Sequence, residues 1–108
     1  MAKPIDVEPE EFDAEVLENQ ELPVLVDFWS PTCGHCLALN PNYDEAAEEL
    51  AGKIKFVKVA FPEGRELFKR FGVRGTPTLV LFKEGEEVER EVGAKPKEDI
   101  VEMCRPHC

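Results

Sequence analysis

The stretch that decides the fold is Val24-Leu-Val-Asp-Phe-Trp29, followed after three residues by Cys33-Gly-His-Cys36. The first six residues are mostly apolar and rich in β-forming side chains, which is typical of a short strand buried on both faces. From Cys36 to Leu50, apolar side chains recur at helical spacing. The sequence therefore predicts a buried strand that leads through a short turn into a long helix, with two cysteines at its start.

Two cysteines separated by two residues allow three interpretations. The pair is half of a tetrahedral zinc site, a redox couple, or two inert core thiols. The chain has four Cys, and the other two, Cys104 and Cys108, do not repeat this spacing. Because the pair also follows a buried strand and opens a helix, we favour the redox interpretation.

The position of Cys33 favours a reactive thiolate. A free cysteine has a pKa of about 8.5, so a nucleophilic one needs surroundings that stabilise negative charge. Unpaired N–H groups at the start of a helix supply such surroundings, and His35 adds an imidazole nearby. Cys36, one turn into the helix, is spaced to attack a mixed disulfide on Cys33. Both sulfurs are therefore candidate catalytic groups.

Outward from this stretch, short elements alternate without a repeat or a long linker. Gly52 and Gly72 are expected to end helices, Pro41 to kink one, and Lys83 to Glu86 to join two strands as a hairpin. The last strand alternates polar and apolar residues, which indicates a sheet edge. The predicted helices are 9–18, 36–50, 65–71 and 97–104, and the predicted strands are 24–29, 54–59, 78–82 and 87–92. This order predicts an α/β fold over residues 1–108, a single domain with a mixed sheet covered by helices on both faces.

The composition limits the possible partners and location. The chain has 108 residues and a formal net charge of -10, which is unfavourable for binding nucleic acid or an anionic membrane. No segment approaches the roughly 18 apolar residues of a spanning helix, and the first residues lack the apolar core of a signal peptide. We therefore expect a cytoplasmic protein, in which a close cysteine pair serves redox chemistry or metal binding.

Three stretches together resemble the thioredoxin family across nearly the whole chain. They are Val24 to Cys36, Phe71-Gly-Val-Arg-Gly-Thr-Pro-Thr-Leu-Val-Leu-Phe-Lys-Glu-Gly85, and Val92-Gly93. The resemblance implies the thioredoxin fold, a central mixed β-sheet with two helices on each face. It also implies thiol–disulfide exchange with no cofactor and no metal. The implied partners are disulfide-containing proteins and a thioredoxin reductase-type electron donor, and we expect a monomer.

The resemblance assigns roles to the residues at matching positions. Cys33 would be the attacking thiol and Cys36 the buried resolving thiol. Asp27 interrupts an apolar strand, where an unpaired carboxylate is costly. It would accept the proton of Cys36, with Lys58 as its charged neighbour. These four residues and His35 form the expected catalytic group.

A second group of residues is expected to bind substrates. By the resemblance, Pro77 is a cis-proline that faces the cysteines and leaves the backbone of Thr76 open for pairing with a substrate segment. From the sequence alone, Gly75 to Pro77 is only a turn before a strand. For Trp29, simple core packing is the less favoured alternative. The resemblance implies a docking surface made by Trp29, Gly34, Val73, Arg74, Gly75 and Gly93.

The chain departs from the usual thioredoxin pattern around the cysteines. Thr32 stands where Trp is usual, and Gly34-His35 stands where Gly-Pro is usual, as in protein disulfide isomerases. By the resemblance, this His makes the disulfide more oxidising, so an oxidase or isomerase role stays open beside the favoured reductase. The segment Ala60 to Gly64 also lacks a usual Asp, so partners would dock differently on that side. A non-catalytic binding or metal module is the remaining alternative.

Cys104 and Cys108 belong to no family motif. Cys104 follows Ile100 by four residues and so lies on the buried face of the last helix. The two thiols are inert, or form an auxiliary disulfide once Pro106 has ended the helix, or bind metal together with His107. By the resemblance, the last helix starts near the active-site end and runs away from it. Its eight residues then place Cys104 roughly 12 Å farther from that end than the helix start is. These are therefore possible auxiliary thiols, and we expect His107 to be solvated.

Overall fold

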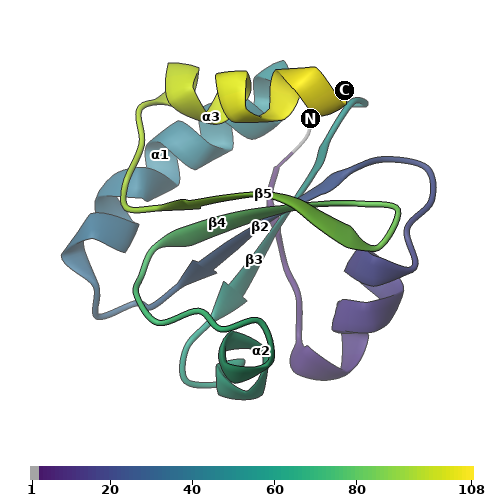
Figure 1. The fold of residues 1–108 in the computed structure, drawn as a ribbon. Coiled ribbons are helices and arrows are strands. Elements are labelled where there is room, and N and C mark those ends of the chain that lie inside the picture. The colour runs from purple at the N-terminus through teal and green to yellow at the C-terminus, as the bar shows by residue number, and fades with distance from the viewer. Residues whose placement is uncertain (1–2) are drawn as a thin grey trace.

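The computed structural model describes residues 3–108. They form a five-stranded sheet in the order β1-β3-β2-β4-β5. The strands are β1 Ile5–Asp6, β2 Val24–Trp29, β3 Lys55–Ala60, β4 Thr78–Lys83 and β5 Glu86–Val92. The helices are α1 Gly34–Glu49, α2 Arg65–Arg70 and α3 Lys97–Cys104, with shorter helical turns at Pro9–Glu11, Asp13–Leu17 and Arg105–His107. The predicted mixed sheet with helices on both faces is confirmed (Figure 1).

Strand β2 lies at the centre of the sheet because both of its faces are apolar. It pairs in parallel with β3 and antiparallel with β4. Val26 and Phe28 pack into the core on one face, and Leu25 packs into the core on the other. Since alternate residues of a strand share a face, Asp27 and Trp29 lie on the same side of β2 as Leu25. That side is the one covered by α1 and α3.

Helices cover both faces of the sheet, and a buried tyrosine holds α1 against its centre. Helices α1 and α3 cover one face, and α2 with the N-terminal turns covers the other (Figure 1). On the α2 face, the rings of Phe28 and Phe68 have centroids 5.2 Å apart, within the usual range for aromatic pairs. On the α1 face, the buried Tyr43 hydroxyl is hydrogen-bonded to carbonyls of β2 and β3 at 3.0 and 2.8 Å. These contacts of the Tyr43 hydroxyl hold α1, and with it the cysteines at its start, against the centre of the sheet.

Three local features differ from the sequence prediction. The helix predicted over 9–18 is two short turns, and in the second the Glu18 N–H donates to the Asp13 carbonyl five residues back. Phe12 and Val16 are buried there, and a spacing of four residues marks a common face without distinguishing the type of helix. Strand β1 has only two residues, too few for a pattern. Helix α1 begins at Gly34, two residues before the predicted start, and continues through Pro41 to Glu49, while the kink at Pro41 stays a prediction.

The predicted turns and the edge strand are confirmed. Strand β5 pairs only with β4 among the described residues and lies at the edge of the sheet. Gly52 and Gly72 follow α1 and α2 with φ of 81° and 67°, a conformation that suits glycine at a helix end. Within residues 3–108, no helix is both long enough and apolar enough to cross a membrane.

Candidate active site

Cys33 is the N-cap residue of α1, at the end of the turn that follows β2. The Cys33 N–H donates to the Ser30 carbonyl at 3.1 Å, which closes this turn. The Cys33 Sγ accepts a hydrogen bond from the Cys36 N–H at 3.2 Å. A sulfur that caps a helix in this way is stabilised as a thiolate by N–H groups and by the helix dipole. The geometry predicted for the attacking sulfur is present.

The two active-site thiols differ in exposure and in acidity. Cys33 is partly exposed, and hydrogen bonds from the side chains of Cys36 and Thr76 lower the pKa of its thiol. Cys36 is fully buried, and burial followed by its hydrogen bond with Cys33 raises the pKa of the Cys36 thiol to about 11. One sulfur is therefore suited to attack from the surface, and the other holds its proton until it is needed.

His35 lies in the first turn of α1 with an exposed side chain. Its contribution to the lowered pKa of Cys33 comes from its backbone N–H. That the imidazole also stabilises the thiolate stays a prediction. Gly34, the first residue of the helix, is exposed beside the two sulfurs.

Asp27 is a fully buried carboxyl group on the α1 side of β2. Neither of its oxygens has a hydrogen-bond partner among residues 3–108. Burial raises the pKa of Asp27 from 3.8 to about 7, and the charge of Lys58 lowers it by a smaller amount. A carboxyl group with this pKa exchanges a proton readily near neutral pH. It lies on the sheet face packed against α1, the helix that carries Cys36.

Lys58 lies opposite Asp27 in the pairing of β2 with β3. Its ammonium group contacts two other side chains. It donates to Asn40 Oδ1 at 3.1 Å, and it lies 4.2 Å from the centre of the Trp29 ring. The sequence analysis missed Asn40. The available signal was its place one turn after Cys36 on the same helix, where the spacing of four brings side chains onto one face.

The segment with Pro77 lies next to the cysteines. The Thr76-Pro77 bond is cis, as is Phe61-Pro62. The Cys33 thiol donates to the Thr76 carbonyl at 3.5 Å, which joins β2 and the start of β4 at the site. The Gly93 N–H donates to the Pro77 carbonyl at 2.8 Å, and Gly93 has a φ of 101° that suits glycine. The expected cluster of Cys33, Thr76, Pro77 and Gly93 is thus brought together.

Four of the expected docking residues line two separate hollows, and Gly34 and Gly93 line neither. An open groove of about 380 Å³ is lined by Ser30, Thr32, Phe61, Phe68, Val73, Arg74, Gly75 and Thr76. Phe61, 42% exposed, was not anticipated and adds an apolar surface there. Trp29 lines a different hollow, together with Pro31, Lys58 and the acidic side chains of Asp6, Glu8 and Glu63. The groove beside Thr76 and the Trp29 hollow therefore offer surfaces of different charge.

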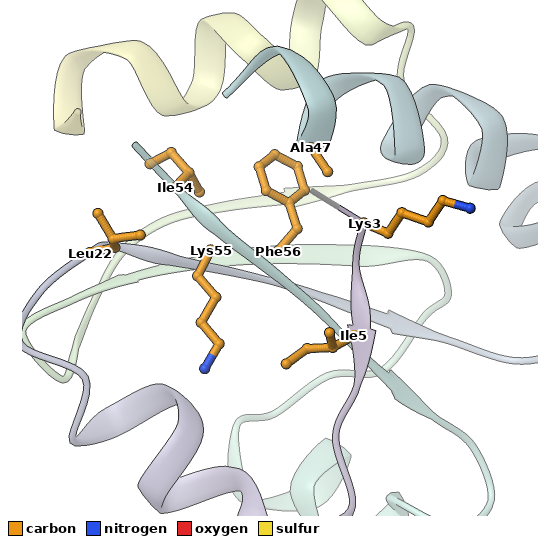
Figure 2. A pocket seen from close by; sticks show the side chains of 7 residues that line it. All are labelled: Lys3, Ile5, Leu22, Ala47, Ile54, Lys55 and Phe56. Atoms are coloured by element: carbon orange, nitrogen blue, oxygen red, sulfur yellow. The ribbon is translucent and has the colours of Figure 1, made fainter. Parts of the chain in front are cut away.

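A third hollow lies at the opposite ends of the strands. Its lining is Lys3, Ile5, Leu22, Ala47, Ile54, Lys55 and Phe56 (Figure 2). In Figure 2, the ammonium groups of Lys3 and Lys55 point away from the apolar side chains that line the hollow. Leu22 precedes β2 and Lys55 begins β3, whereas the cysteines follow the carboxyl end of β2. This hollow is not part of the cysteine site.

The C-terminal cysteines lie apart from the site. In Figure 1, the arrowheads of β2 and β3 point toward the end of the sheet where α1 begins. The C-terminus lies at the other end. Cys104 is fully buried, and burial raises the pKa of its thiol to about 12, with a smaller effect of Cys108. The exposed Cys108 thiol donates to the Cys104 carbonyl at 3.6 Å.

The last residues of the chain pack against the edge strand β5. His107 is not simply solvated, because it is partly buried with its Nε2 3.3 Å from Glu89 Oε2. Helix α3 ends at Cys104, two residues before Pro106, and Pro106 lies within the short helical turn Arg105–His107. Within residues 3–108, no group of three or more His, Cys, Asp or Glu side chains is arranged to hold a metal ion.

Burial predicts how fast each thiol is alkylated by iodoacetamide in the reduced protein at neutral pH. Cys33 reacts first, since it is partly exposed and its pKa is lowered. Cys108 follows, and the buried Cys36 and Cys104 react at least about 100-fold more slowly, because they need a local opening of the fold. Mass spectrometry of timed samples measures each site, and the unfolded protein is the control. Equal rates for Cys104 and Cys108 would contradict the packing of α3.

Comparison with known proteins agrees with this geometry. The family model described as thioredoxin matches residues 3–105. Thioredoxin 1 of Nostoc sp. is 44% identical over 96 residues, which cover 89% of each chain. The thioredoxin of Haemophilus influenzae is 38% identical over 107 residues, 99% of each chain. The thioredoxin of Pyropia yezoensis is 45% identical over 89 residues, 82% of each chain.

Proposed function

Because the chain belongs to the thioredoxin family and is a thiol–disulfide oxidoreductase, we propose that it reduces disulfides of other proteins through Cys33 and Cys36. The observation that carries this proposal is the asymmetry of the pair. Cys33 is partly exposed with a lowered thiol pKa, whereas Cys36 is buried with a raised one. This asymmetry gives the two sulfurs different steps in the reaction.

In the first step, the Cys33 thiolate attacks one sulfur of the substrate disulfide. The substrate S–S bond breaks, a mixed disulfide with Cys33 forms, and the departing substrate thiolate takes a proton from solvent. In the second step, Cys36 loses its proton and attacks the Cys33 sulfur. The mixed disulfide breaks, the second substrate sulfur leaves as a thiolate, and the protein ends with a Cys33–Cys36 disulfide. Two electrons have passed to the substrate.

Asp27 is proposed to accept the proton of Cys36 in the second step. With a pKa raised to about 11, the Cys36 thiol is a poor nucleophile near neutral pH unless a base assists it. Asp27 has a pKa of about 7 and no competing hydrogen-bond partner in the part of the chain that the structure describes. Lys58 is the charged neighbour that keeps this carboxyl group partly ionised. The buried carboxyl group thus has a function that offsets its cost to folding.

Substrates are proposed to dock along the groove that begins beside Cys33. The Thr76 and Pro77 backbone would pair with an extended segment of the substrate, as in β-strand addition. The apolar side chains of Phe61 and Val73 would cover that segment, with Gly93 adjoining Pro77. Trp29, with Gly34 nearby, would contact the substrate from the other side of the cysteines.

The proposal includes partners and a location. The oxidised protein requires an electron donor, proposed to be a thioredoxin reductase-type enzyme. The net charge of -10 favours basic docking faces on partners. We propose that the protein acts as a monomer in the cytoplasm, where thiols are kept reduced.

The reduction potential of the Cys33–Cys36 pair tests the direction of exchange. We expect a value closer to the about -270 mV of reducing thioredoxins than to the about -180 mV of protein disulfide isomerase. The reason is that the chain belongs to the thioredoxin family and is 38 to 45% identical to the thioredoxins it was compared with. Equilibration with glutathione or dithiothreitol buffers, followed by alkylation and mass spectrometry, gives the value.

The matched control is Cys36→Ser, which has no two-electron couple at this site. A potential near that of protein disulfide isomerase would overturn the reductase proposal in favour of an oxidase or isomerase. Stoichiometric zinc on the purified, reduced protein would instead support a metal-binding module.

A further inference from the structure

The ammonium group of Lys58 is held on the side of α1. Its hydrogen bond to Asn40 Oδ1 is 3.1 Å long, and the Trp29 ring centre lies 4.2 Å away. Asp27 is the direct neighbour of Lys58 in the pairing of β2 with β3, and yet both of its oxygens lack a hydrogen-bond partner among the described residues. The cation therefore bonds to a neutral amide while the nearby buried carboxyl group remains unpaired.

The groups that face Asp27 leave Lys58 as its charged partner. From α1, the buried Cys36 and Tyr43 lie on this side of the sheet, and Tyr43 is hydrogen-bonded to backbone carbonyls. From α3, Cys104 lies in the same core cluster as Tyr43. Strand β4 places the apolar Leu79 opposite Asp27. Cys36, Tyr43 and Cys104 are neutral when protonated, so the cation that attracts the Asp27 carboxylate is Lys58.

The position of the Lys58 ammonium group depends on the acceptor that holds it, which is the Asn40 amide oxygen. The Lys58 side chain has four rotatable bonds, and its ammonium group moves to the best available acceptor. Without the Asn40 amide, the acceptors left to this ammonium group are the Asp27 carboxylate, opposite it on β2, and the carboxylates of Asp6, Glu8 and Glu63, which line the same hollow. Of these, Asp27 is the fully buried one, where an ion pair is screened least by water. An ion pair there would hold Asp27 in its charged form and make it a weaker base. The amide of Asn40 therefore competes with Asp27 for the same cation.

We propose that Asn40 is a positioning residue for proton transfer, because it anchors the Lys58 ammonium and thereby keeps Asp27 unpaired and able to take up a proton. This inference rests on the proposed role of Asp27 as the proton acceptor of Cys36. Asn40 acts through Lys58 and touches neither sulfur. It adds to the site a residue that lies one helical turn beyond Cys36.

The test follows the titration of Asp27 directly. The carboxyl carbon of Asp27 is observed by nuclear magnetic resonance as a function of pH in the oxidised protein, where Cys33 and Cys36 have no protons to lose. Four variants are compared with the wild type: Asn40→Ala, Asn40→Asp, Lys58→Met, and Asn40→Ala combined with Lys58→Met. The matched control is Asn42→Ala, which removes the same amide two residues along α1, where it donates to the Lys95 carbonyl.

The two substitutions of Asn40 are expected to move the titration of Asp27 in opposite directions. In Asn40→Ala, the freed ammonium approaches Asp27 and lowers its pKa by on the order of half a unit. In Asn40→Asp, a carboxylate holds the ammonium more firmly and adds negative charge, so the pKa of Asp27 rises. Asn42→Ala leaves it unchanged. A residue that only supported the fold would not produce opposite shifts.

The double variant shows whether the effect passes through Lys58. With Lys58→Met as the background, Asn40→Ala is expected to cause no further shift. An unchanged pKa of Asp27 in Asn40→Ala, or a shift that persists without Lys58, would overturn the proposal. The pH profile of disulfide reduction is measured separately on the same variants. If the Asp27 titration shifts while the profile does not, then Asn40 positions Lys58 as proposed but the role of Asp27 in the reaction is wrong.

Discussion

Cys33→Ser is expected to abolish disulfide reduction, with a loss of at least about 1000-fold in turnover. The serine hydroxyl is far less acidic than the thiol, so its oxygen is not ionised near neutral pH. The stabilising contacts of the N-cap position, from the Cys36 N–H and from the side chains of Cys36 and Thr76, act on a negatively charged sulfur. In the serine variant these contacts have no anion to stabilise, because the hydroxyl stays protonated. The first covalent step is lost.

Cys36→Ser is expected to fail at the other step. Cys33 remains partly exposed and still attacks the substrate, but no resolving thiol breaks the mixed disulfide. The substrate therefore accumulates as a covalent complex with Cys33. Electrophoresis without reducing agent detects this complex, and added dithiothreitol releases it.

Cys104→Ser and Cys108→Ser are matched controls for these variants. Both positions lie outside the site, and Cys108 is exposed at the chain end. Turnover close to that of the wild type is expected for Cys108→Ser, with reduction of insulin by dithiothreitol as the assay. If Cys33→Ser kept substantial activity while Cys108→Ser lost it, the reactive pair would have been assigned to the wrong end of the chain.

The residues that the sequence predicted best are those with two independent constraints. Strand β2 has the predicted bounds, since a six-residue apolar run flanked by polar turns allows little choice of register. The helix after it was predicted to begin at the cysteines, and α1 begins at Gly34. The position of Cys33 at a helix start followed from these two elements. A strand and a helix that meet in a short turn define the turn closely.

The features that the sequence did not reveal depend on contacts between distant segments. The hydrogen bond of Lys58 to Asn40 joins β3 to α1, and no local pattern pairs these two residues. The same holds for His107, whose partner Glu89 lies 18 residues away on β5. The separation of Trp29 from the groove at Thr76 depends on where the chain turns after β3. Local periodicity identifies which face of an element is buried, but not which polar side chains meet.

Asp27→Asn is expected to stabilise the folded protein, by an amount that grows with pH to on the order of 4 kcal/mol above pH 7. The pKa of Asp27 is about 7 in the folded protein, and its ordinary value of 3.8 applies to the unfolded chain. The difference of about three pKa units, at about 1.4 kcal/mol per unit, gives the magnitude. It is the free energy of ionising a carboxyl group that has been removed from water.

The direction follows from proton binding. Between pH 4 and pH 7 the folded protein holds a proton on Asp27 that the unfolded chain has already lost, so the free energy of unfolding of the wild type falls as pH rises. Above about pH 7 both states are ionised and the loss is complete. Asparagine does not titrate, so the variant lacks this decline. The two proteins should differ little near pH 4, where Asp27 is neutral in the folded protein and only about half ionised in the unfolded chain.

Denaturant unfolding of the oxidised proteins at several pH values measures this difference, with Asp44→Asn as the control for removal of an exposed negative charge from α1. The same Asp27→Asn variant should reduce disulfides more slowly, since Cys36 loses its proposed base. A gain in stability accompanied by a loss in turnover would show that the buried carboxyl group serves the reaction at the expense of the fold. A stability difference that did not change between pH 4 and pH 9 would mean that Asp27 ionises in the folded protein as easily as in water. Asp27 would then be unsuited to accept the proton of Cys36.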